Sequence, residues 1–312
     1  MRDGTPRRRI TRRRVLAGAG AVAASGVAGG AYATGIEPFR SVVTSYDIRP
    51  RAPWPAGLRL RIAALADLHA CEPWMSPTRI AGIVAATNAL EPDLVVLLGD
   101  YVAGLNVVTR YVTAAEWAPV LGGLRAPLGV HAVLGNHDWW EDRTAQARGR
   151  GPTIAGEALA KAGIRVLSNE AVALPVPGGP VWLAGLEDQL ALLPGRRRHG
   201  HPRIGLDDLA ATLAPVPDGA PVILLAHEPD IFPKVPARVA LTLSGHTHGG
   251  QVRLFGQSPM VPSRYRNRYA YGHIREHTDL VVSGGLGLSI APVRFGVPPE
   301  IVVVTLGAET SA

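Results

Sequence analysis

The sequence predicts an α/β fold in which two β-sheets face each other in one domain and helices cover their outer sides. Two observations lead to this prediction. Short apolar runs of strand length alternate with helix-forming segments in the first half of the chain, and the second half is mostly strand. Neither an internal repeat nor a clear linker follows residue 57. The chain after this point is therefore expected to form a single unit.

The first half of the chain is expected to alternate strands with helices. Residues 36–48 mix apolar and polar side chains, which is typical of an edge strand, and the Pro-rich residues 51–57 form a connector. The first core strand is expected at residues 58–66. Ser76-Pro77 then predicts the start of a helix that ends before Pro92, with Ser as the cap and Pro in the first turn. Its inward-facing residues would be Ile80, Ile83, Val84 and Thr87.

The remaining elements follow from the same patterns. A continuous apolar run of strand length is typical of a buried strand. Apolar segments predict strands at residues 94–98, 130–134, 181–186, 222–226, 239–243, 251–254, 280–283 and 301–306. Helices are expected at residues 114–124 and 153–162, and the second of these closes at Gly163.

Length and composition narrow the class of protein. With 312 residues, of which 47% are hydrophobic, the chain can bury a full core and is not expected to be disordered. Seven Arg and one Asp in residues 1–30 give this segment a net charge of +6, so the rest carries only +1 of the total of +7. A nearly neutral body argues against a nucleic-acid partner. The single cysteine, Cys71, excludes an internal disulfide and a zinc site built from several cysteines.

The first 33 residues resemble an export leader. Arg7-Arg8-Arg9 and Thr11-Arg12-Arg13-Arg14 precede an uncharged stretch at residues 15–33, and Ala31-Tyr32-Ala33 has the small-x-small form of a cleavage site. A paired arginine before a weakly hydrophobic segment is similar to a twin-arginine signal. This predicts contact with the twin-arginine export machinery and a location in the periplasm or cell envelope. An uncleaved anchor and a basic, disordered terminus are the alternatives.

Five polar motifs each follow an expected strand. They are Asp67-Leu68-His69, Gly99-Asp100, Gly135-Asn136-His137-Asp138, Ala226-His227 and Gly245-His246-Thr247-His248. Each therefore lies where a strand ends in a loop. Hard oxygen donors mixed with imidazoles suit a divalent transition metal. There are too many donors for one ion but enough for two ions that share a carboxylate, which predicts metal-assisted hydrolysis of a phosphate ester.

The first two motifs supply carboxylates. On an extended strand end, residues two apart point the same way, so Asp67 and His69 are expected to face one ion. Asp100 follows a buried strand, where a carboxylate is costly unless it is paired or binds a cation. Its two oxygens can bridge two metals, which an imidazole cannot do. The alternatives are a surface loop pair for Asp67 and His69 and a turn or helix-cap role for Asp100.

The tetrad at residues 135–138 predicts both a ligand and an acid. Gly135 allows a sharp turn out of the strand, and the Asn136 carbonyl can ligate a metal without adding charge. His137 would then face the substrate. Asp138 would orient the His137 ring and stabilise its protonated form, as in a carboxylate–imidazole general-acid pair.

The last two motifs are histidines. A lone His227 at a strand end is either a ligand or a hydrogen-bonded core residue. The pair His246 and His248 lies between glycines that let the backbone come close to ions and substrate. Alternate residues there can face two metals, which favours a metal site.

This series of motifs resembles the calcineurin-like metallophosphoesterase superfamily from residue 58 to the C-terminus. Gly245 to Gln251, Gly285-Leu286-Gly287 and Pro292-Val293-Arg294-Phe295 are similar to a bacterial branch of exported or membrane-associated phosphoesterases. That branch includes enzymes similar to UDP-2,3-diacylglucosamine pyrophosphatase. The sequence departs from the family pattern at Ala66 and Ala103, where the family often has a Ser and an acidic residue.

The resemblance implies a four-layer α/β/β/α sandwich of two mixed sheets, with residues 58–312 as the catalytic domain. The sequence patterns described above assign residues 34–57 as a connector or edge strand and residues 1–33 as a signal or anchor. It also implies two divalent ions, Mn, Fe, Zn or Co with Mn favoured, that share a hydroxide for attack on phosphorus. Within the family His137 would protonate the leaving oxygen. Asp100 would bridge the metals. The first metal would take Asp67, His69, Asp100 and His248, and the second Asp100, Asn136, His227 and His246.

Other groups have weaker claims to the site. Trp139 and Trp140 would stack on a base, sugar or acyl chain, or pack in the core. The basic segments at residues 196–199 and 264–268 would hold a phosphate or acidic headgroup, or form solvated loops. Trp139 and Arg264 are the substrate-binding candidates. The other histidines, His131, His199, His201, His273 and His277, are expected in a strand or in loops away from the chemistry.

The predicted function is hydrolysis of a phosphodiester or pyrophosphate bond outside the cytoplasm. The substrate would carry a nucleotide-linked or lipid-linked phosphate, and a membrane surface is a candidate contact. A phosphomonoesterase acting on phosphoproteins or small metabolites stays open, because two metals serve both reactions. A metal-stabilised, non-catalytic envelope protein is the alternative from another class. The presence of His137 beside a complete ligand set argues against it, because metal storage needs no acid.

Overall fold

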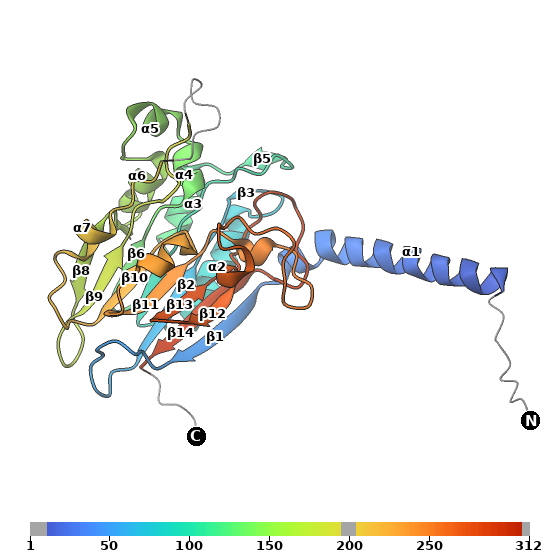
Figure 1. Cartoon of the computed structure of the whole chain (residues 1–312). Coiled ribbons are helices and arrows are strands. Elements are labelled where there is room, and N and C mark those ends of the chain that lie inside the picture. Colours follow the sequence, from blue (N-terminus) through green and yellow to red (C-terminus); the bar gives the residue numbers. More distant parts are fainter. Residues whose placement is uncertain (1–10, 195–203, 308–312) are drawn as a thin grey trace, which may run out of the picture.

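The computed structural model describes residues 11–194 and 204–307 and contains two six-stranded mixed sheets that pack face to face (Figure 1). The first sheet has the order β1-β14-β2-β4-β6-β7, and the second has the order β12-β13-β11-β10-β9-β8. Each sheet joins segments that are far apart in the chain. Strand β14, near the C-terminus, lies between β1 and β2.

The first sheet is parallel over four of its six strands. Strands β2, β4, β6 and β7 are parallel, β14 is antiparallel to β2, and β1 pairs in parallel with β14 at the edge. The carboxyl ends of β2, β4 and β6 therefore meet at one edge of the sheet. The strand bounds are β1 Val42–Ile48, β2 Leu60–Leu65, β4 Leu94–Leu97, β6 Val130–Ala132, β7 Arg165–Val166 and β14 Glu300–Leu306.

The second sheet has a parallel centre and antiparallel edges. Strands β9, β10, β11 and β13 are parallel, whereas β8 and β12 run antiparallel to their neighbours. The bounds are β8 Glu170–Leu174, β9 Val181–Gly185, β10 Val222–Leu225, β11 Val239–Ser244, β12 Gly272–Arg275 and β13 Asp279–Val282. A separate ribbon pairs β3 Cys71–Glu72 with β5 Arg110–Tyr111.

Both faces of the central strands are buried, which explains their continuous apolar sequences. In β2, Ile62 and Ala64 pack between the sheets, whereas Ala63 and Leu65 pack against the helices outside. The outer face of the first sheet is covered by α2 Pro77–Ala89, α3 Ala114–Leu121 and α6 Ile154–Lys161. The second sheet is covered by α7 Leu209–Leu213 and the short helix η2 Pro229–Lys234. The predicted four-layer α/β/β/α sandwich is thus confirmed.

Most of the predicted elements are present. Ser76 caps α2 by accepting the backbone N–H of Arg79, Pro77 occupies its first turn, and the four residues predicted to face inward are buried. The predicted strand at residues 251–254 is wrong. Val252 and Leu254 make only isolated bridges, because Gly249 and Gly250 with positive φ turn the chain before it can extend. The edge strands β8 and β12 and the short helices α4 Asn136–Trp140 and α5 Arg143–Arg148 were not predicted. The remaining short helices are η1 Glu37–Phe39, η3 His248–Gly250 and η4 Arg266–Tyr269.

The N-terminal helix α1, Arg12–Gly35, projects away from the sandwich (Figure 1). Its last turn is docked on the domain, because Ala33 is buried and its carbonyl accepts the backbone N–H of Arg294 at 2.9 Å. The predicted cleavage motif ends at this docked residue. In the parts of the chain that the structure describes, no helix is both long and apolar enough to span a bilayer.

Candidate metal centre

The seven predicted ligands converge at the carboxyl ends of strands from both sheets. Asp67 and His69 follow β2, Asp100 follows β4, and Asn136 follows β6. The second sheet contributes His227 after β10, and His246 with His248 after β11. Each of the seven is at most 9% exposed. The structure therefore brings together side chains that are up to 181 positions apart in the sequence.

The backbone at these strand ends is unusual. Asp67, His69, Asp100, His246 and His248 all have positive φ, between 46° and 68°. Side-chain-bearing residues avoid this left-handed region, and such outliers gather at functional sites. The expected extended backbone at Asp67 and His69 is therefore wrong, and the sharing of one ion by the two side chains stays a prediction. Two left-handed residues, with the buried Leu68 between them, turn both side chains toward the same point.

Two glycines let these loops approach each other. A Cβ on Gly135 would overlap Oδ1 of Asp100, and a Cβ on Gly245 would lie 2.5 Å from Oδ2 of Asp67. Larger residues at either position would push the two loops apart. Gly135 and Gly245 thus allow carboxylates and imidazoles from different loops to come close enough to bind the same ions.

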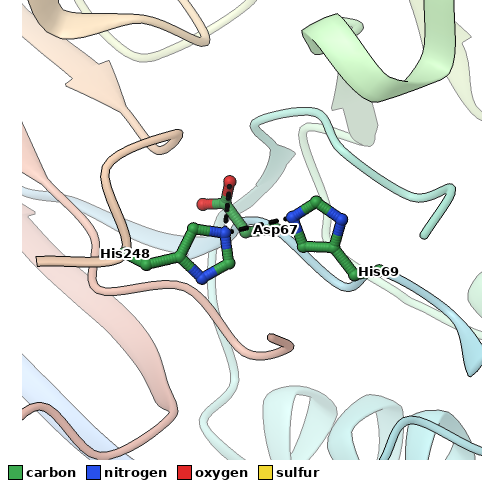
Figure 2. Close-up of side chains that lie close together, drawn as sticks. All are labelled: Asp67, His69 and His248. Atoms are coloured by element: carbon green, nitrogen blue, oxygen red, sulfur yellow. Dashed lines mark hydrogen bonds and ion pairs between the residues drawn. The ribbon is translucent and has the colours of Figure 1, made fainter. Parts of the chain in front are cut away.

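The first cluster contains Asp67, His69 and His248 (Figure 2). Nε2 of His248 lies 3.0 Å from Nε2 of His69 and 3.5 Å from Oδ1 of Asp67. Asp67 is held in place because both its oxygens accept the backbone N–H of His246, at 2.9 and 3.1 Å. Two ring nitrogens and a carboxylate oxygen thus face a common point.

The second cluster contains Asp100, His227 and His246, with Asn136 beside them. Oδ2 of Asp100 lies 3.3 Å from Nε2 of His227 and 3.5 Å from Nε2 of His69. This oxygen therefore lies between one histidine of each cluster, which is the position that a bridging carboxylate needs. The other oxygen, Oδ1, accepts the backbone N–H of His137 at 2.8 Å.

Three histidines have their ring orientation and tautomer fixed by backbone carbonyls. His69 Nδ1 donates to Val102 O at 3.1 Å, and His227 Nδ1 donates to Leu98 O at 2.6 Å. His246 Nε2 donates to Pro262 O at 2.9 Å. In the neutral rings of His69 and His246, a proton on one nitrogen leaves a lone pair on the other, directed into the cluster, which is the arrangement of metal-bound histidines.

The donor set fits divalent cations. With its proton on Nε2, His246 presents a lone pair on Nδ1, only 2.8 Å from the carbonyl oxygen Oδ1 of Asn136. Two such facing acceptors are unfavourable alone and become favourable around a cation. Imidazole, carboxylate and amide donors suit Mn, Fe, Zn or Co.

The ionisation of the groups agrees with this fit. Burial lowers the pKa of His69 and of His246 to about 3, so both rings are neutral, as ligands must be. Burial opposes ionisation of Asp100, but His227 and His137 hold its pKa well below the ordinary value. The same Asp100 outweighs burial at His227 and raises the pKa of that ring well above its ordinary value. Ion binding at the second cluster would therefore release a proton from His227.

His137 lies at the rim of the clusters, and its ring centroid is 5.0 Å from that of His69. Burial lowers its pKa, but Asp100 and Glu141 outweigh burial and the net direction is upward. Nδ1 of His137 lies 3.5 Å from Oε1 of Glu141. These carboxylates thus favour the protonated ring, which suits the predicted general acid.

Asp138 mainly supports the backbone around Asp100, although its charge also contributes to the raised pKa of His137, as predicted. Its oxygens accept the backbone N–H groups of Asp100, Tyr101, Val102 and Gly135, at 2.9 to 3.1 Å. Within the described residues it makes no hydrogen bond to the His137 ring. The prediction that Asp138 orients His137 is therefore wrong, and Glu141, one helical turn after His137, occupies that position. Asp138 instead fixes the loop that carries Asp100.

The two substrate-binding candidates do not line the clusters. Trp139 is 2% exposed and its Nε1 donates to Glu187, so it is a core residue and the prediction that it stacks on substrate is wrong. Trp140 is the tryptophan beside the site, with its ring centroid 5.1 Å from that of His137. Arg264, two residues after Pro262, is exposed, and its Nε lies 3.1 Å from Oδ2 of Asp230. The basic run at residues 196–199 and His201 lie outside the described residues.

Sequence reasoning missed three buried groups near the metal ligands. Asp188 and Glu228 form, with His227, a further group compact enough for an ion. Burial raises the pKa of both carboxyls. Asp188 follows β9 as the ligands follow their strands, so the same strand-end signal was available for it. Arg294 is fully buried, with its guanidinium 3.3 Å from Nδ1 of His248, and no spacing in the sequence indicates this contact.

Two cation-sized donor clusters that share one carboxylate, with an imidazole at their rim, are the arrangement of a metal-dependent hydrolase of phosphate esters. Residues 60–250 match the family model described as calcineurin-like phosphoesterase. The chain belongs to the calcineurin-like phosphoesterase family. It is therefore a metal-dependent phosphoric ester hydrolase, and the centre described above lies within the matched residues except for Arg294.

Three curated relatives are similar over most of their length. The uncharacterized metallophosphoesterase YkuE of Bacillus subtilis is 29% identical over 307 residues, which cover 96% of this chain and 98% of the relative. An uncharacterized metallophosphoesterase of Aquifex aeolicus is 31% identical over 252 residues, which cover 81% of this chain and 87% of the relative. The phosphodiesterase YaeI of Escherichia coli is 28% identical over 255 residues, which cover 79% of this chain and 82% of the relative.

Proposed function

We propose that this protein hydrolyses a phosphodiester or pyrophosphate bond with two divalent metal ions, Mn favoured, outside the cytoplasm. The observation that carries the proposal is the position of Asp100 Oδ2, within 3.5 Å of a histidine nitrogen of each cluster. When bound, two ions supply an acidified water as nucleophile and neutralise charge on the phosphate. The similarity to a relative named as a phosphodiesterase supports the choice of a diester.

In this proposal the side chains have three roles: binding the metal ions, donating a proton and stabilising the protonated His137. Asp67, His69 and His248 hold one ion, Asn136, His227 and His246 hold the other, and Asp100 contacts both. His137 donates a proton to the leaving oxygen, because an alkoxide is a poor leaving group unless it is protonated. Glu141 stabilises the protonated ring of His137.

The test uses two chromogenic substrates with the purified protein. With Mn²⁺, bis-p-nitrophenyl phosphate should be cleaved, and EDTA should abolish the cleavage. Faster cleavage of p-nitrophenyl phosphate than of the diester would favour a phosphomonoesterase. Stoichiometric metal binding without cleavage of either compound would favour a non-catalytic envelope protein. A screen with nucleotides, UDP-linked lipids and glycerophosphodiesters would then identify the natural substrate class.

We also propose that residues 1–33 direct export through the twin-arginine machinery. Exposed Arg12 and Arg13 at the start of α1, followed by a weakly apolar helix outside the sandwich, support this. Exchanging both arginines for lysine in the full chain should retain the protein in the cytoplasm. Unchanged export would contradict the proposal.

A further inference from the structure

A group of exposed apolar side chains lies beside the metal centre. We call Ile36, Leu254, Phe255, Met260 and Ile290 the rim patch. Phe255 is fully exposed, Ile290 is 69% exposed and Met260 is 64% exposed. A single exposed apolar residue is ordinary, but several on adjoining loops indicate an interaction surface.

The segments that carry the rim patch are held together by the chain around Phe295. Arg253 donates its N–H to Phe295 O at 2.7 Å, and the Gln251 side chain donates to Ala291 O at 2.8 Å. On the other side, Val297 donates its N–H to the carboxylate of Glu37 at 2.9 Å. The turn after α1, the loop after η3 and the loop after β13 are therefore neighbours.

The loop that carries three of the five patch residues, Leu254, Phe255 and Met260, begins and ends beside predicted metal ligands. Gln251, at the start of the patch loop, is three residues after His248. Pro262, at the end of the same loop, accepts the proton of His246 Nε2 at 2.9 Å. A partner that covers the rim patch would therefore lie against the entrance of the site.

The charge around the patch is positive. Residues 31–40, 251–268 and 285–299 contain one acidic residue, Glu37, which is 3% exposed. Four exposed arginines lie in the same ranges, and Asp230 and Glu276 pair with two of them, Arg264 and Arg268. The other two are Arg40 and Arg266. Apolar side chains among unneutralised arginines are typical of a surface that rests on anionic lipid.

The N-terminal helix starts from the same place. Helix α1 leaves the domain beside the patch loops (Figure 1), and Tyr32 in its last turn packs on Phe295 with the ring centroids 6.2 Å apart. We propose that the rim patch is the surface on which the domain docks to an anionic phospholipid bilayer, with the metal centre at the lipid interface. This inference does not depend on which phosphate ester the site hydrolyses.

The experiment places an environment-sensitive fluorophore on the patch of the full chain. The single native cysteine, Cys71, is buried, so a cysteine introduced by Phe255→Cys can be labelled selectively. Ile154→Cys on α6, 61% exposed and on the far layer of the sandwich, is the matched control. Vesicles of phosphatidylglycerol and phosphatidylcholine should shift the emission of the label at position 255 to the blue and leave the label at 154 unchanged. Pure phosphatidylcholine should give a weaker shift.

Ile290→Cys provides a second reporter if the variant at Phe255 does not fold. Co-sedimentation with vesicles without any blue shift at positions 255 and 290 would mean that α1 alone holds the membrane, and would overturn the proposal. Equal shifts at the patch and at position 154 would also overturn it. Hydrolysis of soluble bis-p-nitrophenyl phosphate is measured on the same samples. Failure of membrane docking can therefore be distinguished from failure of the proposed hydrolysis, because the label emission and the hydrolysis rate are measured separately.

Discussion

Nη2 of Arg294 lies 3.3 Å from Nδ1 of His248 in the protein core, where the guanidinium is completely shielded from solvent. His248 thus differs from the other three ligand histidines, whose second nitrogen donates to a carbonyl. Burial lowers the pKa of Arg294 to about 10, so the group stays charged at neutral pH. It satisfies its remaining donors with the carbonyls of Gly284, Gly285, Gly287 and Val297.

Replacing Arg294 should release metal from the first cluster. The turn that Arg294 holds donates the N–H of Gly287 to Asp67 O at 2.6 Å, so loss of the guanidinium would loosen both Asp67 and His248. Arg294→Gln should lower affinity at this cluster about 10–100-fold, the usual effect of a residue that orients a metal ligand. Elemental analysis after dialysis should find about one ion per chain. Arg268→Gln, at an exposed ion pair, should keep two, and equal metal content in both variants would contradict this role.

Removing the ring of His137 should separate chemistry from metal binding. His137→Ala should keep both ions and lose about 10²–10⁴-fold in turnover of bis-p-nitrophenyl phosphate, the range for a general acid. The loss should be smaller for a substrate with a better leaving group, which needs less protonation. Because His137, His69 and Asp100 also form a compact group, the variant is analysed for metal in parallel. Loss of an ion in His137→Ala would make it a ligand instead.

Glu141 should set the alkaline limit of activity. A general acid works only when protonated, so the rate falls as pH rises through the pKa of His137. Glu141 contributes to the raised pKa of this ring, and its removal therefore lowers that pKa. The pH–rate profile of Glu141→Gln should lose activity at a lower pH than the wild type. Glu116→Gln, at an exposed ion pair on α3, should leave the profile unchanged. A profile of Glu141→Gln that matches the wild type would show that Glu141 does not act on His137.

Replacing Asp138 should lower the stability of the folded protein. Four backbone N–H groups point at its carboxylate, and an Asn has one acceptor oxygen for them. Each buried donor left without a partner costs about 1–3 kcal/mol, so Asp138→Asn should unfold at lower denaturant concentration and bind metal more weakly. Asp208→Asn, at the exposed cap of α7, should change little because Asn also caps helices well. A normal unfolding midpoint with lost activity would restore the ring-orienting role.

Local chemistry made much of the fold predictable. The Ser76-Pro77 helix start depends on neighbouring residues alone, and the apolar runs of β2, β4, β10 and β11 require burial on both faces. The edge strands β8 and β12 were missed because each is short and is defined by pairing with a neighbouring strand, and Ile274 is the one apolar residue of β12. The failed strand at residues 251–254 has a similar cause, since two preceding glycines with positive φ redirect the chain.

The convergence of the seven predicted ligands could be predicted from the sequence, whereas the contacts that orient their side chains could not. Each ligand belongs to a short motif that ends an apolar run, which a single sequence displays. The contacts that orient the ligands join distant segments, such as His227 to the carbonyl of Leu98 and His248 to Arg294. The task of Asp138 was misjudged for the same reason, because its four donors lie mostly in another loop.

The central claim is that one carboxylate, Asp100, joins two metal sites. A crystal of the Mn²⁺-loaded protein, with anomalous data collected at the Mn edge, tests it most directly. The account predicts two anomalous peaks about 3.5–4 Å apart, one beside Asp67, His69 and His248 and the other beside Asn136, His227 and His246, with Asp100 in contact with both. A single peak, or two peaks that do not share Asp100, would contradict it.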